Sequence, residues 1–568
     1  MCSVDTLMLR LFPLRKINPL NQLNMKRTQT LLIGLAIALA PYLAFSQEKS
    51  DDAISVGENI AVTGTQSGQV RGYIHKGIFT YKGIPYGKAE RFQPAEKLAP
   101  WKGIRSSLTY GAVCPIDATT SVNDEMEFPF HHDWGFPNED CLKLNVWTPG
   151  ISDQKKRPVM VWLHGGGYTA GSSIELPSYD GENLSRKGDV VVVSINHRLN
   201  VLGFLDLSAY GDKYKSSANV GIMDIVTALQ WVKDNIGQFG GDPDNVTIFG
   251  QSGGGGKVNT LLSAPSAKGL FQKAIVESGS YAGKFMDAAI SKRIGAAILD
   301  ELHFQPSQVD SLQHISYERL NAAGKRALSK VQAEMKAEGK SVWMFGLNWE
   351  PSNDGTFLPY QLDDPKVLEI SKNVPVLLGS TKNEFFASII NPAIRNYSMD
   401  DVKRDLKKKY GDKADTYIAA VNKAYPNTTK PSDYMDIDLT LFRPGVLWQA
   451  DRKTKFGGAP VYMYMFGFQS PVFDGRFKAI HCMDIPFEFD NIARCEEMTG
   501  GGKEAYKLAD KMSQAWINFA TTGDPNAKGL PNWPKYTADN GALMYFDIKP
   551  EIKYHHDKEL LDMQAAVK

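Results

Sequence analysis

The stretch that decides the fold is Val246-Thr247-Ile248-Phe249-Gly250-Gln251-Ser252-Gly253-Gly254-Gly255-Gly256. Its β-branched and aromatic beginning predicts a strand, and the glycines that follow predict a tight turn before a helix. Gly250, Ser252 and Gly254 form the pattern G-x-S-x-G, in which a serine sits at a strained strand-to-helix turn above the edge of a sheet. Glycine suits the flanking positions because a side chain there would clash with backbone passing nearby.

Two other interpretations of this stretch were weighed. A phosphate-binding Walker A loop needs a glycine, four residues and then Gly-Lys-Ser/Thr. Counting back from Gly256-Lys257 reaches Gln251, and Val258 follows the lysine, so that pattern fails. A glycine-rich turn without chemistry stays open on this stretch alone, and the rest of the chain has to decide.

The composition is that of a large folded protein. The chain has 568 residues, of which 43% are hydrophobic, and its net charge is only +1. Because basic residues are not in excess, nothing indicates a nucleic-acid partner. The length exceeds that of an ordinary domain, but α/β enzymes often keep long insertions within one domain, so we expect residues 47–568 to form a single catalytic domain.

Residues 1–46 have the pattern of a secretory signal region. Lys26-Arg27 is a short basic patch, residues 31–40 are an apolar run, and Ala44-Phe45-Ser46 offers small residues at a cleavage site. The run is short for a transmembrane helix, and no cysteine follows the cleavage site, so we expect no stable membrane anchor. Translation is expected to start at Met25. The mature protein should be mildly acidic and exported, either periplasmic or secreted.

The cysteines fit an exported protein. Cys114, Cys141, Cys482 and Cys495 remain after the signal region is removed, and an even number in an oxidising compartment suggests disulfides. Of the three possible pairings, local spacing favours Cys114–Cys141 and Cys482–Cys495. A zinc site is the alternative, but no C-x-x-C spacing supports it, so no metal is expected.

Apolar runs and amphipathic stretches alternate along the chain. Buried strands are predicted at 158–163, 189–195, 246–249, 273–276, 374–379 and 461–466, with hairpin strands near residues 73–81 and helices near 222–236 and 508–519. Such alternation predicts an α/β fold with a mostly parallel central sheet and helices on both faces. Sites in these folds lie beyond the carboxyl ends of the strands, where Ser252 falls.

A second glycine motif follows the strand at 158–163. His164-Gly165-Gly166-Gly167 has the form of a loop whose N–H groups bind an oxyanion, and the N–H of Gly253 would add a donor. Two such motifs in this order argue against chance.

The general base and the acid that orients it should follow Ser252 in the sequence. His481 comes after the last strong strand, whereas the other later histidines lie in charged or helical sequence (His303, His314, His555, His556). Glu384 follows the strand at 374–379 and is the preferred acid. Asp354, in Asn353-Asp354-Gly355, is the alternative, although it looks like a turn residue.

These motifs resemble the type B carboxylesterase family, the α/β-hydrolases that include cholinesterases and bacterial para-nitrobenzyl esterases. The resemblance also rests on 139–147 (EDCLKLNVW), 241–250 (GDPDNVTIFG), 196–199 (NHRL), 203–204 (GF) and 519–526, and it spans about Val70 to Tyr536. It implies a triad of Ser252, Glu384 and His481, an oxyanion hole of Gly166, Gly167 and Gly253, and a loop disulfide Cys114–Cys141. It implies a small carboxylic ester as substrate and no cofactor.

The chain departs from the family pattern at four places. Gln251 stands where glutamate is common, Phe385 where a glycine often follows the acid, and Cys482 where a small residue follows the histidine. His131 stands where cholinesterases carry a tryptophan, with Trp134 nearby, which argues against choline esters.

Function classes other than ester hydrolysis were considered. Some relatives are adhesion proteins that have lost the serine, whereas every triad position is filled in this chain. Amide cleavage uses the same machinery and stays open. Residues 285–370, with Trp343, Phe345 and Trp349, are expected to form the substrate mouth or to pack as ordinary helices over the site. The natural ester and the oligomeric state cannot be read from the sequence.

Overall fold

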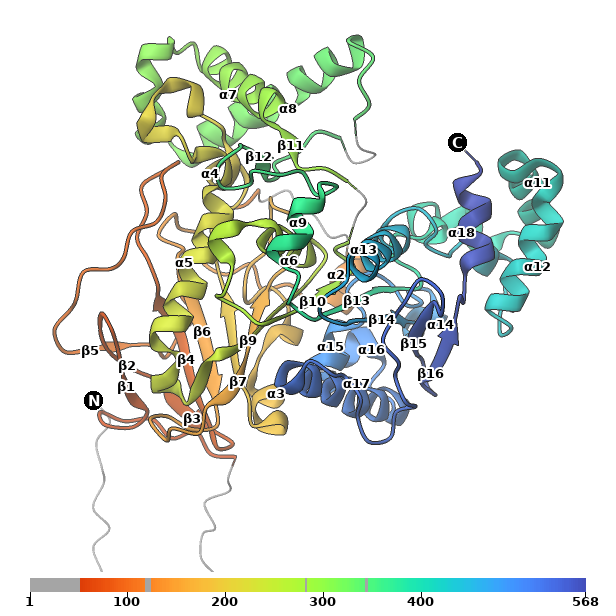
Figure 1. Ribbon diagram of the computed structural model, residues 1–568, viewed down its shortest axis with the longest axis horizontal. Helices are drawn as coiled ribbons and strands as arrows, with labels where there is room; N and C mark the ends of the chain where they lie inside the picture. Colours follow the sequence, from red (N-terminus) through yellow and green to blue (C-terminus); the bar gives the residue numbers. More distant parts are fainter. Residues whose placement is uncertain (1–51, 118–123, 281–282, 343–345, 568) are drawn as a thin grey trace, which may run out of the picture. The chain divides into compact units, whose positions relative to one another are not determined.

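A twisted central sheet carries helices on both of its faces (Figure 1). The computed structural model describes residues 52–117, 124–280, 283–342 and 346–567. The features of the expected signal region lie outside these residues. Ser55–Lys568 form one compact unit by their contacts.

Eleven strands form the main sheet within the described residues, in the order β16-β15-β14-β13-β10-β9-β7-β8-β6-β4-β3. Neighbouring strands from β15 to β8 in this order run parallel, and the outer pairs are antiparallel. The strands are β3 (Tyr73–His75), β4 (Ile78–Pro85), β6 (Lys143–Thr148), β7 (Arg157–Leu163), β8 (Val191–Ile195), β9 (Gly241–Gln251), β10 (Lys273–Glu277), β13 (Val376–Thr381), β14 (Val461–Phe466), β15 (Ala542–Phe546) and β16 (Glu551–Tyr554).

Two smaller sheets are also present among the described residues. The first joins β1 (Val62–Thr65), β2 (Gly68–Arg71) and β5 (Ile104–Ser106), and the second is the pair β11 (Met286–Asp287) and β12 (Ser352–Asn353).

The central strands are buried on both faces, and successive side chains enter different cores, as the two-residue period of a strand requires. Val161 of β7 and Ile248 of β9 join the core beneath α5 (Val220–Asn235) and α6 (Gly253–Ser263). Trp162 and Phe249 join the opposite core, which α3 (Glu182–Gly188), α15 (Ile485–Glu488) and α17 (Lys503–Thr522) cover. Because these strands are buried on both faces, their sequences are near-continuous apolar runs.

Further helices pack around this framework, and α13 (Phe442–Phe456) lies against β13 and β14. In Figure 1, α7 (Ala288–Leu302) and α8 (Tyr317–Ala337) lie side by side, and α18 (Lys558–Ala565) lies near α11 (Met399–Tyr410) and α12 (Ala414–Ala424). The remaining ones are α2 (Asp124–Phe130), α4 (Asn200–Phe204), α9 (Pro365–Ile370), α10 (Ala387–Ile390), α14 (Val472–Gly475) and α16 (Glu496–Thr499).

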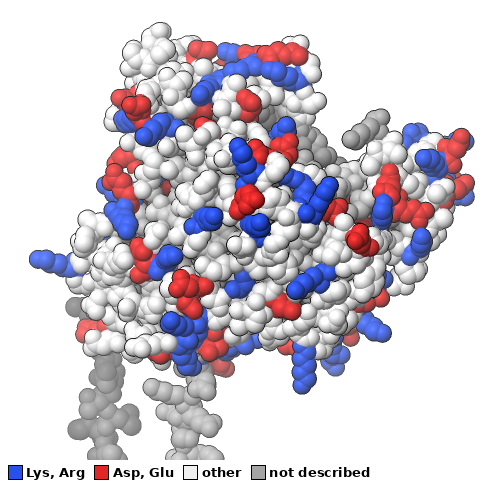
Figure 2. Space-filling model, viewed as in Figure 1, with Lys and Arg blue, Asp and Glu red and all other residues white. Residues whose placement is uncertain are grey.

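The predicted strands and helices are present, with ends displaced by a few residues. The strand predicted at 374–379 runs Val376–Thr381, and the helix predicted at 222–236 runs Val220–Asn235. Among the described residues, no helix has the length and apolar character needed to cross a membrane. On the face shown in Figure 2, basic and acidic side chains are interspersed over the surface.

Candidate active site

Ser252 sits on the sharp turn between β9 and α6. Its backbone is strained, with φ +57° and ψ −124°, and its N–H donates to the carbonyl of Glu277 at 2.8 Å. A Cβ on Gly250 or Gly254 would lie 2.5 Å or 1.9 Å from the carbonyl oxygen of Leu163 in the neighbouring strand β7. Both glycines of the motif are therefore required by close backbone approach, as the sequence pattern predicted.

The turn that carries Ser252 packs against the loop that follows β7. A Cβ on Gly253 would lie 2.3 Å from the carbonyl oxygen of Gly167. Gly166 and Gly167 have φ values of +76° and +62°, which glycine adopts most readily. Within the described part of the chain, the N–H groups of Gly166 and Gly167 donate no hydrogen bond. The three glycines predicted to bind an oxyanion are thus brought together.

The carbonyl groups of this loop are held in place. The carbonyl of Gly166 accepts from the N–H of Ala170 at 3.0 Å and from that of Thr169 at 3.3 Å. In a planar trans peptide the N–H points away from the C=O. Holding the Gly166 carbonyl therefore fixes the direction of the Gly167 N–H.

His481 and Glu384 are paired. The Nδ1 atom of His481 lies 2.5 Å from Oε2 of Glu384, whose carboxylate is fully buried. The other oxygen, Oε1, accepts from the hydroxyl of Ser278 at 2.6 Å and from the N–H of Thr381 at 2.8 Å. These contacts fix the carboxylate and leave Nε2 of the imidazole as the atom available for proton transfer.

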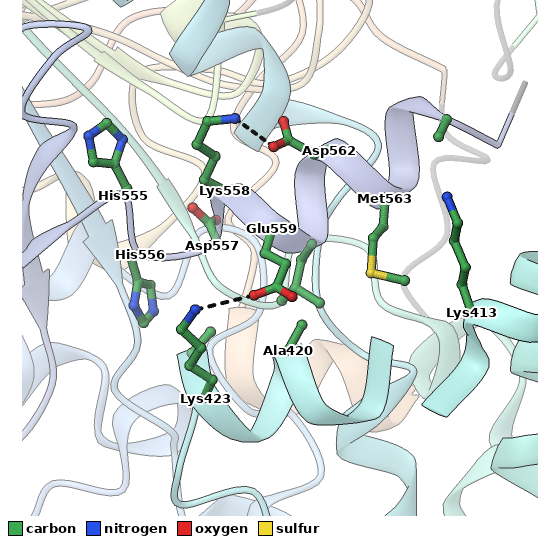
Figure 3. Close-up of a pocket in the computed structure, with 13 residues that line it drawn as sticks. Lys413, Ala420, Lys423, His555, His556, Asp557, Lys558, Glu559, Asp562 and Met563 are labelled. Atoms are coloured by element: carbon green, nitrogen blue, oxygen red, sulfur yellow. Dashed lines mark hydrogen bonds and ion pairs between the residues drawn. The ribbon is translucent and has the colours of Figure 1, made fainter. Parts of the chain in front are cut away.

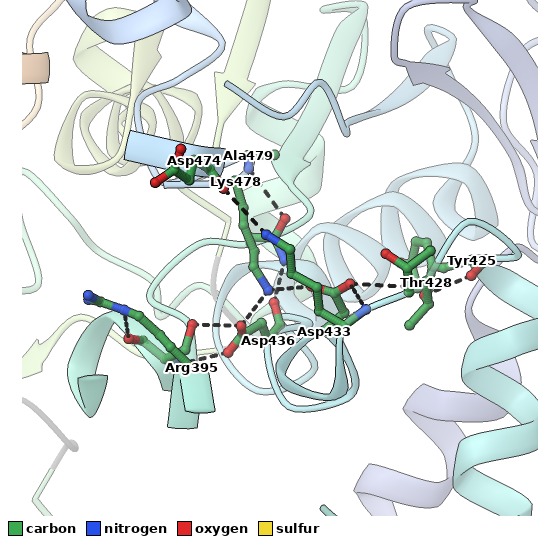
Figure 4. A network of polar contacts seen from close by, with 12 residues as sticks. Arg395, Tyr425, Thr428, Asp433, Asp436, Asp474, Lys478 and Ala479 are labelled. Carbon is green, nitrogen blue, oxygen red and sulfur yellow. Dashed lines mark hydrogen bonds and ion pairs between the residues drawn. The ribbon is translucent and has the colours of Figure 1, made fainter. Parts of the chain in front are cut away.

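Two loops that carry this pair are joined by a buried polar network (Figure 4). Lys478 donates to Asp433 and Asp436, at 2.6 Å each. Asp436 in turn accepts from both the N–H (2.8 Å) and the hydroxyl (2.7 Å) of Ser388. Asn383 completes the link, since its N–H donates to the carbonyl of Ala479 at 3.2 Å. The network ties the segment around Glu384 to the segment that ends at His481.

The imidazole contacts two aromatic rings, which are themselves neighbours with centroids 6.5 Å apart. The ring of Phe385 is centred 4.5 Å from that of His481, and the ring of Phe442 is stacked on it at 5.2 Å. Phe385 is 47% exposed. The residue that replaces the usual glycine after the acid therefore restricts the histidine ring and faces solvent beside it.

Gln251 and Cys482 contact each other beside the imidazole. Nε2 of Gln251 lies 3.3 Å from both ring nitrogens of His481, and the thiol of Cys482 donates to Oε1 of Gln251 at 3.2 Å. Cys482 is a free thiol, as is the buried Cys495. The predicted Cys482–Cys495 disulfide is not seen in this structure, in which the Cys482 side chain is turned toward Gln251.

Cys114 and Cys141 lie together without being joined. Both are buried free thiols, and a hydrogen bond to Cys114, with burial, raises the pKa of Cys141. The predicted disulfide is not formed in this structure, although the two side chains are in contact.

The alternative acid and base residues lie elsewhere. Asp354 accepts from the N–H groups of Thr356 and Leu358 at 2.9 and 3.0 Å and from Asn219 at 2.8 Å, so it is the turn residue that the sequence suggested. His303 ends α7 in a left-handed conformation. His555 and His556 line a cavity of about 480 Å³ between α12 and α18, where Lys423 and Lys558 pair with Glu559 and Asp562 (Figure 3).

The predicted substrate mouth is only partly described. Trp349 is buried, and its ring packs beside Gly324 of α8, which favours ordinary packing for this residue. Trp343 and Phe345 lie outside the described residues. Across the described chain, no group of three or more His, Cys, Asp or Glu side chains is arranged to hold a metal ion.

Three buried carboxyl groups beneath the site were missed by sequence reasoning. Glu277, at the end of β10, lies beside the buried carboxyl group of Glu488, and it accepts from the indole of Trp516 at 2.8 Å. Burial raises the pKa of Glu277 to about 8 and, with the charge of Glu384, that of Asp484 to about 6. No motif in the sequence signals these contacts.

Lys257 was also missed as a part of the site. It is fully buried in α6, and its ammonium donates to the carbonyls of His164 at 2.8 Å and Gly165 at 3.3 Å. A lysine within the apolar face formed by Val258, Leu261 and Leu262 is the signal that could have drawn attention to it.

The chain was compared with known proteins. Residues 59–564 match the family model described as the carboxylesterase family. The chain is 34% identical over 503 residues to para-nitrobenzyl esterase of Bacillus subtilis, covering 87% of this chain and 96% of that protein. It is 31% identical over 490 residues to phenmedipham hydrolase of Pseudarthrobacter oxydans, covering 84% and 94%.

A solved structure agrees with these sequence matches. An esterase from anaerobic Clostridium hathewayi, described as able to hydrolyse aliphatic aromatic polyesters, superposes with a TM-score of 0.81 at 36% identity. The match covers 91% of this chain and all of that one.

Proposed function

This chain is an enzyme of the carboxylesterase family, and we propose that it hydrolyses carboxylic esters through an acyl-enzyme formed on Ser252. Its fold is the α/β-hydrolase fold that the sequence predicted. The observation that carries the proposal is the arrangement around the turn that holds Ser252. The glycine loop after β7 packs against this turn, and the side chain of Gln251, next to Ser252, lies 3.3 Å from the imidazole that pairs with Glu384. All of these groups follow the carboxyl ends of parallel strands in one sheet.

In the first half of the reaction, Oγ of Ser252 attacks the ester carbonyl carbon while its proton passes to Nε2 of His481. The C=O bond becomes a C–O⁻ that accepts from the N–H groups of Gly166, Gly167 and Gly253. The C–O bond to the alcohol then breaks, and the alcohol leaves with the proton from His481.

In the second half, His481 takes a proton from water as the water oxygen attacks the acyl carbon, and Ser252 leaves with that proton. Glu384 keeps the proton of the imidazole on Nδ1 and stabilises the ring while it is charged. Ser252 and His481 are not hydrogen-bonded to each other in this structure, and such contacts commonly tighten only when substrate binds.

Small carboxylic esters are the proposed substrate class. The printed names of a para-nitrobenzyl esterase, a phenmedipham hydrolase and an esterase for aliphatic aromatic polyesters make esters that carry an aromatic ring the first compounds to test. Gln251 is neutral where a glutamate would add a buried negative charge, so a cationic ester gains no favourable charge at this position.

Export is part of the proposal. Its support is the basic patch, apolar run and small cleavage residues in 1–46. N-terminal sequencing of the protein recovered from periplasm and medium would test it. A mature protein that starts near Gln47 is expected, and recovery of the uncleaved chain in the cytoplasm would contradict export.

The test of function is hydrolysis of p-nitrophenyl esters from acetyl to decanoyl by wild type, Ser252→Ala and Ser263→Ala. Ser263 lies in the same helix, and its hydroxyl donates only to the carbonyl of Asn259 at 2.9 Å, so it is a matched control. Loss of hydrolysis in Ser252→Ala alone supports the proposal. The acyl chain length that is hydrolysed fastest indicates the size of the pocket that binds the acyl group. Equal activity of all three proteins would overturn it.

A further inference from the structure

Lys257 is a buried cation that the reaction scheme does not use. Its side chain has no solvent exposure, and burial lowers its pKa to about 7 against the opposing effect of the Glu175 carboxylate. A cationic side chain is costly to bury unless its donors are satisfied. Both of its recorded acceptors, the carbonyls of His164 and Gly165, belong to the loop that carries the oxyanion donors.

The Gly165 carbonyl is held from two sides. It accepts from the ammonium of Lys257 at 3.3 Å and from Nδ1 of His164 at 3.0 Å. That imidazole stays neutral, since burial and the nearby charge of Lys257 lower the pKa of His164 well below its usual value. The carbonyl therefore has two donors, and only one of them carries a charge.

The consequence follows from the geometry of the peptide unit. The carbonyl of Gly165 and the N–H of Gly166 belong to one planar trans peptide and point in opposite directions. Fixing the carbonyl toward Lys257 fixes the N–H of Gly166 toward the opposite side. A Cβ on Gly166 would meet the carbonyl oxygen of Ala170 at 2.4 Å, so this peptide cannot be oriented by a side chain of its own residue.

We propose that Lys257 is a positioning residue of the oxyanion hole, whose ammonium fixes the Gly165–Gly166 peptide and polarises its N–H toward the substrate oxygen. The proposal rests on the proposed function of Ser252 and the glycine donors. A hydrogen bond to a charged donor strengthens the polarisation of the accepting peptide, and preorganised donors stabilise an oxyanion without rearranging during the reaction. Lys257 touches neither the substrate nor the reacting atoms.

The spacing in the chain explains how one lysine can serve this purpose. Lys257 lies five residues after Ser252 on the helix that begins at the nucleophile turn. The helix packs against β7, whose end leads into the oxyanion loop. The same short segment therefore supplies the nucleophile, the donor Gly253 and the support for the donor Gly166.

The experiment compares wild type with Lys257→Met, which keeps the length of the side chain and removes its charge and donors. Lys453→Met is the matched control, because Lys453 is also buried, donates to the carbonyl of Ser371 at 2.9 Å, and has its pKa lowered to about 8 by burial. Each protein is assayed with p-nitrophenyl butyrate and inhibited by an alkyl trifluoromethyl ketone, whose adduct with serine places an oxyanion in the hole.

We expect Lys257→Met to lower kcat by about 10- to 100-fold, somewhat less than the loss of a whole donor, with KM changed less than about twofold. Inhibition by the ketone should weaken by about the same factor as kcat. Lys453→Met should keep kcat within about twofold of wild type. A merely structural role would not weaken ketone binding in proportion to kcat.

Three results would overturn the proposal: unchanged kcat in folded Lys257→Met, a fall in kcat without weaker ketone binding, or an equal fall in Lys453→Met. If Lys257→Met does not fold, Lys257→Gln, which keeps a neutral donor, is expected to fold and to show a smaller loss. Failure of both to fold would make the lysine a requirement of folding and would also overturn the proposal. Hydrolysis that survives in Ser252→Ala would instead refute the proposed function itself.

Discussion

Replacing Glu384 by glutamine should reverse the tautomer of His481. In the native site, Oε1 of Glu384 accepts from Ser278 and Thr381, and Oε2 accepts from Nδ1 of His481. The backbone N–H of Thr381 can only donate, so the glutamine oxygen must face it. The glutamine NH₂ then faces Nδ1, which must accept, and the ring proton moves to Nε2. An imidazole in this form cannot take the proton of Ser252.

The size of the effect can be worked from the contact. The closest atoms of the pair are 2.5 Å apart. The charge of each group is spread over several atoms, so the two charges are treated as unit charges about 4 Å apart, which attract by about 4 kcal/mol at an effective dielectric constant of 20. Losing this stabilisation of the charged imidazole lowers kcat by about 10³-fold. The wrong tautomer brings the expected loss to about 10³–10⁴-fold.

The assay is the steady-state hydrolysis of p-nitrophenyl acetate by wild type, Glu384→Gln and Glu384→Asp. KM should change little, and Glu384→Asp, which keeps the charge on a shorter side chain, should lose less activity than the glutamine variant. Thermal unfolding should show that Glu384→Gln is folded. A folded Glu384→Gln enzyme with kcat within about tenfold of wild type would refute the reasoning.

Three further predictions concern the buried groups around the site. The folded-state pKa of Glu277 is raised to about 8. Its contribution to stability is therefore full below the unfolded pKa of about 4.3 and is lost as pH rises through 8. Glu277→Gln should raise Tm relative to wild type more at pH 8.5 than at pH 5, and equal shifts in Tm at both pH values would contradict this. Lys478→Met should lower the free energy of unfolding by about 3–5 kcal/mol in urea titrations, because it leaves Asp436 buried without its cation; a change below about 1 kcal/mol would show that the pair is not needed. Mild oxidation should join Cys114 to Cys141, whose side chains are in contact, and peptide mapping that instead finds Cys482 joined to Cys495 would contradict the structure.

The sequence predicted the layers of the fold because the strongest signals are local. A strand buried on both faces must be apolar at successive positions, as in residues 158–163, and a covering helix must repeat its apolar residues at helical spacing, as in 222–236. The outer hairpin of β3 and β4 was also predicted, because its two strands are neighbours in the sequence. The antiparallel pairing of β6 with β4 and β8 and the order of all eleven strands in the described sheet depend on long-range pairing, which leaves no local pattern.

The candidate site could be predicted where the backbone itself requires a residue type. Gly250, Gly254 and Gly166 are needed by close contacts or by positive φ, and such requirements leave motifs in a sequence. The network of Lys478 and Asp436 and the pair Glu277–Glu488 leave none, because their side chains meet only after distant segments pack together. The predicted disulfide of Cys482 is not seen in this structure, and spacing along the chain does not show that its thiol faces Gln251.

The central claim is that Ser252 forms the acyl-enzyme. Its most direct test is rapid acid quenching of the enzyme with p-nitrophenyl acetate, followed by mass spectrometry of the intact chain and of the peptide containing Ser252. We expect one acetyl group per chain, located on Ser252, absent from Ser252→Ala and present in Ser263→Ala. An acetyl group on another residue, or turnover without any covalent adduct in wild type and in Glu384→Gln, would contradict it.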